Sequence, residues 1–223
     1  MNISKKNGFS ILGVILVIVA IIVAIGVWAL SGQSNTSNTN ASSDILASSL
    51  VIDSRSIMSE YEKLVISQKS NDASITFQPG VSDINNFVNA DNGFPVPKVP
   101  AQAVVQGTVE PRGIYVFSKA FNANLGDVNQ PDHAIMVAGV KDSVCQKINF
   151  SLHASTDIPV FTALSDSGAF VQGATASNPN SSVLVRFIDG GTAVSGLGWV
   201  NGCIKGNNGA LDDNLYFQVL KTT

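Results

Sequence analysis

The first pattern along the chain is a long apolar run. From Phe9 to Leu30 no side chain is charged, and these 22 residues are enough to cross a hydrocarbon core of roughly 30 Å as one helix. Lys5 and Lys6 stand just before the run, which favours a cytoplasmic amino terminus. Gly26 permits close helix contact, and Trp28 lies where an interfacial aromatic is expected. The pattern predicts a membrane-spanning helix over residues 9–30.

A polar tract and a second helical pattern follow. Residues 31–43 are rich in Ser, Asn and Thr, whose side chains compete with helical hydrogen bonds, so we expect a spacer that interrupts the helix. Ser42 or Ser43 can cap a new helix that runs to about Gln68. Its apolar positions recur at spacings of three, four and seven: Ile45, Leu46, Leu50, Ile57, Met58, Tyr61, Leu64 and Val65. This stripe predicts an amphipathic helix packed on a sheet.

Residues 70–112 show no regular period. Gln78-Pro79-Gly80 indicates a turn, and Ser82 can open a short helix to Asn89. The Asn and Asp residues of this segment are interpreted as turns and caps rather than a calcium loop, because they lack the acidic spacing of one. A connection this long is usually functional.

From Gly113 onward the apolar period changes to two, which predicts strands. The expected strands are Ile114–Phe117, His133–Ala138, Cys145–His153, Ser182–Ile188 and Leu215–Leu220, while Gly196–Gly202 is a strand edge or a bend. The predicted class is α+β: a long hydrophobic amino-terminal helix, then one globular head over residues 44–223 with an amphipathic helix on a mainly antiparallel sheet.

Charge and cysteine content narrow the function. Lys and Arg number 13 against 16 Asp and Glu, with no basic cluster beyond Lys5 and Lys6, so nucleic acid is not an expected partner. Cys145 and Cys203 are the two cysteines, and in an exported domain they are expected to form a disulfide. Closing that loop stabilises the fold by about 4 kcal/mol.

No catalytic constellation is recognised. His133 and His153 lie in predicted strands, where a structural histidine is favoured over a general base. The chain has no nucleophile elbow, no zinc-protease motif and no phosphate-binding glycine loop. We therefore expect no enzyme and no cofactor.

The amino-terminal junction resembles that of a known family. Lys5-Lys6-Asn7-Gly8 followed by Phe9 is similar to the leader and processing site of type IV prepilins and of type II secretion pseudopilins, whose cut lies before the apolar run. The resemblance implies that residues 1–8 are a leader, that a prepilin peptidase cleaves after Gly8, and that Phe9 becomes N-methylated. It further implies a pilin-like head, an inner-membrane single-pass precursor, and partners among other pilin subunits and the inner-membrane assembly machinery. The final location is then an extracellular filament or a periplasmic pseudopilus.

Two positions are compared with the family pattern. Most members carry a glutamate at the fifth mature position, where this chain has Gly13, and this departure fits a minor, tip or initiating subunit. Asp212 and Asp213 are similar in position to the carboxy-terminal calcium loop of major pseudopilins, although a solvated turn is the favoured interpretation.

Two other interpretations stay open. One is a plain signal anchor. The other is a membrane-anchored or filament-tip adhesin, in which residues 70–112 and 190–210 contact a surface or ligand.

Overall fold

The computed structural model describes residues 35–68, 74–105, 113–122, 125, 131–161, 163–165, 174–175, 178–181, 185–189, 192–193, 197–207 and 212–222. The chain divides into two compact units, residues 1–42 and residues 43–223. The expected leader and the expected apolar helix over 9–30 lie outside the described residues. Among the described helices, none is both long and apolar enough to cross a bilayer.

The first described element is helix α2 (Asn35–Gln68). It ends where the sequence predicted, but it begins earlier, because residues 35–43 are helical rather than an interrupting spacer. Ser, Asn and Thr each disfavour a helix by only a few tenths of a kcal/mol, and a helix that is already nucleated gains one hydrogen bond per added residue. Residues 31–34 lie outside the described part.

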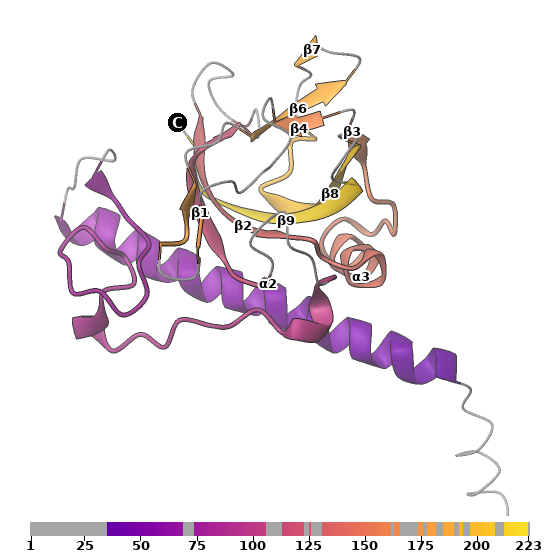
Figure 1. The fold of residues 1–223 in the computed structure, drawn as a ribbon, viewed down its shortest axis with the longest axis horizontal. Helices are drawn as coiled ribbons and strands as arrows, with labels where there is room; N and C mark the ends of the chain where they lie inside the picture. The colour runs from indigo at the N-terminus through magenta and orange to yellow at the C-terminus, as the bar shows by residue number, and fades with distance from the viewer. Residues whose placement is uncertain are drawn as a thin grey trace, which may run out of the picture. The chain divides into compact units, whose positions relative to one another are not determined.

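One face of α2 packs on the sheet (Figure 1). Its fully buried positions are Leu50, Ser54, Ile57 and Tyr61. They recur at intervals of three and four residues, the spacing of one helix face. The predicted stripe is thus largely confirmed. Ile45 is the exception, since its side chain is 70% exposed.

The sheet has nine strands in the part of the chain that the structure describes, and its main path runs β3-β8-β9-β2-β1-β6-β4. β5 and β7 pair with β1 and β6, respectively, off this path. The strands are β1 (Val116–Asn122), β2 (Asp132–Ala138), β3 (Val160–Phe161), β4 (Ala163–Ser165), β5 (Asn180–Ser181), β6 (Val185–Asp189), β7 (Thr192–Ala193), β8 (Asn201–Asn207) and β9 (Asp212–Lys221). The long neighbours β8, β9, β2 and β1 are antiparallel, whereas β5 and β6 on β1 and β3 on β8 are parallel. The class α+β with a mainly antiparallel sheet is confirmed.

Both faces of the central strands are buried. Along β2, Ile135 and Val137 belong to the core under α2, while Ala134, Met136 and Ala138 belong to a second core on the opposite face. The two ends of the strand order also come together, because β4 lies near β8 and β3 lies near β6. The sheet is therefore curled around the second core, which explains why every residue of β2 is buried.

Residues 142–153 correct one strand prediction. They form helix α3 (Asp142–His153), not the expected strand from Cys145 to His153. The alternation of Ile148, Phe150 and Leu152 suggested a strand, but Phe150 is 58% exposed. The buried side chains are Val144, Cys145, Ile148 and Asn149, which recur at helical spacing.

Two other strand predictions had inexact bounds. The first expected strand began at Ile114, whereas β1 begins at Val116 and continues to Asn122. The expected strand Ser182–Ile188 corresponds in part to β6, which runs from Val185 to Asp189. β8 was missed as a strand, because only a strand edge or bend was expected near its start.

The segment between α2 and the sheet contains no helix over residues 82–89 (Figure 1). Instead, the Asn86 side chain accepts a hydrogen bond from the backbone of Gln78 and donates to the carbonyls of Gln78 and Val81. The side chain thus replaces the backbone pairing that a helix would supply, as Asn does in turns. Two 3-10 turns follow, η2 (Ala90–Asn92) and η3 (Ala101–Ala103).

Candidate functional site

The outward face of α2 carries an unusual line of apolar residues. Ile45, Ile52 and Ile66 are 70%, 61% and 81% exposed. Each pair is separated by a multiple of seven residues, and the exposed Ser59 occupies the remaining heptad position. Residues seven apart lie almost directly above one another on a helix, so these side chains form one stripe opposite the buried face. We call Ile45, Ile52, Ser59 and Ile66 the outer stripe.

An ion pair joins α3 to α2 at Asp44. Lys147 Nζ of α3 lies 3.0 Å from the Asp44 carboxylate. Both side chains are partly exposed, so this pair contributes little to stability.

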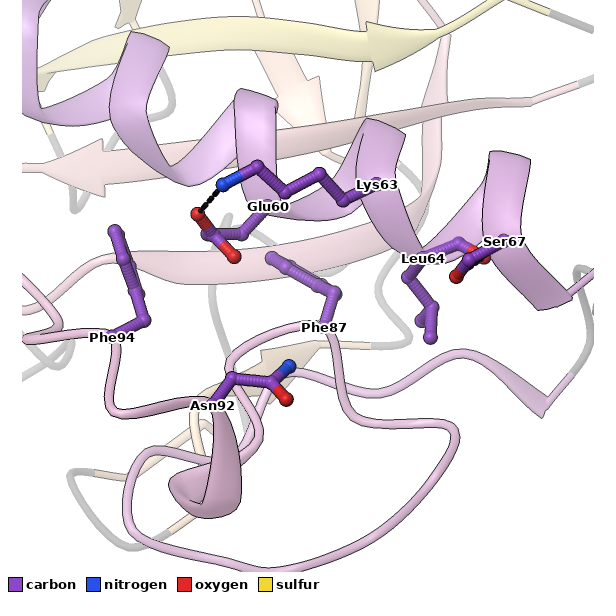
Figure 2. A pocket seen from close by; sticks show the side chains of 7 residues that line it. All are labelled: Glu60, Lys63, Leu64, Ser67, Phe87, Asn92 and Phe94. Atoms are coloured by element: carbon purple, nitrogen blue, oxygen red, sulfur yellow. Dashed lines mark hydrogen bonds and ion pairs between the residues drawn. The ribbon is translucent and has the colours of Figure 1, made fainter.

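A pocket of about 490 Å³ opens beside the second half of α2 (Figure 2). The helix supplies Glu60, Lys63, Leu64 and Ser67, and the following segment supplies Phe87, Asn92 and Phe94. Figure 2 shows the Glu60 carboxylate and the Asn92 side chain on opposite sides of the space, with the rings of Phe94 and Phe87 flanking them.

The charged groups of the pocket neutralise each other. Lys63 Nζ lies 2.5 Å from Glu60 Oε1, and the two residues are three apart on one helix face. The Glu60 side chain is only 13% exposed, whereas that of Lys63 is 67% exposed. The carboxylate is therefore held inside the pocket while the ammonium covers it from the solvent side.

Local structure fixes the pocket wall on the side of the loop. Phe87 is buried and lies 5.4 Å from Tyr61 and 5.2 Å from Phe77, measured between ring centroids. The Asn89 side chain accepts a hydrogen bond from the amide of Asp91 and so caps η2. Gly93 ends η2 with a positive φ of 65°, which glycine adopts without strain. Phe87 and Asn92 therefore stand on a preformed wall.

Buried hydroxyl groups join α2 to the sheet. Tyr216 of β9 is hydrogen-bonded to Ser54 of α2, which also donates to the carbonyl of Val51. The hydroxyl of Tyr115 is buried too; it makes no hydrogen bond of standard geometry among the described residues, although the Asp53 carboxylate lies close to it. Burial raises the pKa of Tyr115 far above its usual value, and the nearby Asp53 carboxylate raises it further. Burial also raises the pKa of Tyr216, although its bond with Ser54 acts in the opposite direction.

The two histidines occupy structural positions. His133 on β2 is buried, and its Nδ1 is hydrogen-bonded to the hydroxyl of Tyr61 at 2.7 Å. His153 ends α3 instead of lying in a strand, and its Nε2 is 2.8 Å from the carbonyl of Asn201. Its ring stacks on Trp199 with the centroids 3.7 Å apart. Each imidazole is thus held by a specific partner within the fold.

The predicted disulfide is confirmed. Cys145 of α3 is bonded to Cys203 of β8. Asn149 reinforces this junction, since its side chain accepts a hydrogen bond from the amide of Cys203 and donates to the carbonyl of the same residue. A side chain at Gly202 would meet the ring of Trp199, with the added Cβ 2.7 Å from Cε3. The end of α3 and the start of β8 therefore form one closely packed unit.

The remaining predicted sites lie outside what the structure describes. This applies to the processing pair Gly8 and Phe9 and to the assembly-helix positions Gly13, Gly26 and Trp28. Asp212 and Asp213 start β9 rather than a preceding turn, and their side chains are not described. The described residues contain no group of three or more His, Cys, Asp or Glu side chains that could hold a metal ion.

The outer stripe and the pocket were not anticipated as sites. Ile52 and Ile66 lay outside the predicted apolar stripe, and their separation by a multiple of seven was the signal that could have revealed a second apolar face. The pocket combines one helix with a loop without periodicity, so no local pattern predicts it.

Comparisons with known proteins add no assignment: neither a protein-family model, nor a curated protein, nor a solved structure matches this chain.

Proposed function

We propose that this chain is a structural subunit of a type IV pilus or a pseudopilus-like filament. It is cleaved after Gly8 by a prepilin peptidase, held in the inner membrane by the helix over residues 9–30, and assembled through that helix. The observation that carries the proposal is the junction at Gly8 and Phe9, where a lysine-containing leader meets an apolar run without a spacer. The run is long enough to exchange lipid contacts for contacts with equivalent helices.

The head supports the proposal in its general layout. A long amphipathic helix follows the apolar run along the chain and covers one face of a mainly antiparallel sheet, which a disulfide stabilises. The outer stripe adds an apolar surface on the same helix, available to a neighbouring subunit. Gly13 in place of the family glutamate favours a minor or tip subunit.

Processing at Gly8 provides the test. The full-length gene is expressed in its native host, and the amino terminus of the purified chain is determined by mass spectrometry. The native chain is expected to start at an N-methylated Phe9, and Gly8→Ala is expected to retain the eight-residue leader. Asn7→Ala is the matched control, because it changes the leader beside the cut and leaves the glycine in place. A Gly8→Ala chain that still starts at Phe9 contradicts the proposal.

A further inference from the structure

We propose that the pocket between α2 and η2 binds a neutral sugar unit of a glycan. This inference goes beyond the filament role and does not depend on it, because it rests only on residues of the head. The volume of about 490 Å³ lies within the range of small-ligand sites, roughly 300–1,000 Å³.

The charge of the pocket favours a neutral ligand. Its two charged residues, Glu60 and Lys63, form an ion pair. The lining therefore has no net charge, and neither a simple anion nor a simple cation gains a net Coulomb attraction. A neutral polar molecule can bond to both groups without separating them.

Free hydrogen-bonding groups face the space. Glu60 uses Oε1 for Lys63, and among the described residues Oε2 accepts no hydrogen bond. The Asn92 carboxamide makes no side-chain hydrogen bond within the same set of residues, so both its donor and its acceptor are available. Ser67 donates to the carbonyl of Leu64 and can still accept. Sugar hydroxyl groups donate and accept at once, so they match this mixture of groups.

The rings supply the apolar part of the site. Phe94 is partly exposed, and Figure 2 shows its ring on one side of the Glu60 carboxylate, with Phe87 on the other. The C–H groups of a pyranose ring form an apolar face that can pack on such a ring while the hydroxyls reach Glu60 and Asn92. Because Phe87 is fixed by Tyr61 and Phe77, this wall does not have to be ordered on binding.

The first experiment measures binding to the full-length chain in mild detergent. It uses saturation-transfer NMR and calorimetry with glucose, galactose, N-acetylglucosamine and their β-linked disaccharides, followed by a glycan array. A ligand of about a dozen heavy atoms in such a pocket is expected to bind with a dissociation constant on the order of millimolar, and disaccharides more tightly. Glycine and free lysine test the alternative of a zwitterion that bridges Glu60 and Lys63.

Variants then assign binding to this pocket. Glu60→Gln preserves shape but removes the charged acceptor, and is expected to weaken sugar binding about tenfold or more. Asn92→Ala lies on the opposite wall and is expected to weaken it by roughly fivefold to tenfold. Glu62→Gln is the control, because Glu62 is exposed on the same helix and does not line the pocket. Circular dichroism verifies that each variant is folded.

The outcomes decide the proposal. Sugar binding that is lost in both pocket variants and kept in Glu62→Gln supports it. It is overturned if no sugar binds the native chain, if folded Glu60→Gln and Asn92→Ala bind as tightly as the native chain, or if glycine or lysine binds more tightly than every sugar. Cleavage after Gly8 is measured separately, so failure here leaves the filament proposal standing.

Discussion

Two buried tyrosines differ in the hydrogen bonding of their hydroxyl groups. Tyr115 and Tyr216 are both almost fully buried near α2. Tyr216 is hydrogen-bonded to Ser54, whereas the Tyr115 hydroxyl makes no hydrogen bond of standard geometry among the described residues and lies near the Asp53 carboxylate. Replacing each with Phe removes one oxygen and leaves the ring, so the two variants compare a satisfied with an unsatisfied buried hydroxyl.

The expected effects differ in sign. Tyr216→Phe is expected to lower the free energy of unfolding by about 1 kcal/mol, the net value of a typical hydrogen bond. Ser54 keeps its bond to the carbonyl of Val51, so no new unpaired donor is created. Tyr115→Phe removes a group whose unpaired burial costs roughly 1–3 kcal/mol, so it is expected to leave stability unchanged or raise it by about 1 kcal/mol after packing losses.

Urea unfolding of the full-length chain measures both variants. The chain has two tryptophans, so in a Trp28→Phe background the fluorescence comes from Trp199, which stacks on His153 in the head. The dependence of the unfolding free energy on urea concentration (the m-value) is expected to stay constant, while the urea concentration at the midpoint of unfolding changes. If Tyr115→Phe destabilises the head as much as Tyr216→Phe does, the assignment of an unsatisfied hydroxyl is wrong.

Two further predictions concern alkaline pH and the outer stripe. Tyrosine in the unfolded chain ionises near pH 10, whereas burial raises the pKa of Tyr115 and Tyr216 well above this value. The stability that these two neutral tyrosines contribute is therefore complete below about pH 10, and above that pH it falls by about 1.4 kcal/mol per pH unit for each group. The free energy of unfolding, measured with urea from about pH 9 to 11, should decline less steeply in Tyr216→Phe than in the native chain. An equal decline in the two proteins contradicts the reasoning. For the outer stripe, Ile52→Asp is expected to reduce surface filaments at least tenfold at equal protein level, counted by immunogold microscopy, because a charge replaces an apolar contact. Ile84→Asp, at an equally exposed isoleucine outside the stripe, is the control, and equal filament numbers in both variants exclude the stripe from assembly.

Some of the fold could be predicted because the signal was local. The end of α2 and most of its buried positions follow from apolar spacing, and β2 and β9 follow from short, nearly continuous apolar runs, as expected of strands buried on both faces. The partners in the disulfide could be predicted because the chain has two cysteines, which leaves one choice of pairing.

Other parts depended on tertiary contacts. Ile148, Phe150 and Leu152 alternate with polar residues as in a strand. The segment is nevertheless a helix, because packing against the sheet buries Ile148 and leaves Phe150 exposed. The position of Asn92 and Phe94 opposite Glu60 is set by turns that the Asn86 and Asn89 side chains hold. Such turns bring together residues about thirty positions apart in the chain, and no periodic pattern encodes that meeting.

The continuity of α2 has a mechanical consequence. Within the head, tension applied at the Ser43 end of α2 enters along the axis of the helix that lies against the sheet. The buried contacts from Leu50 to Tyr61 then bear the load together in shear, rather than opening one after another. The bond between Cys145 and Cys203 keeps the intervening 58-residue loop from lengthening under load.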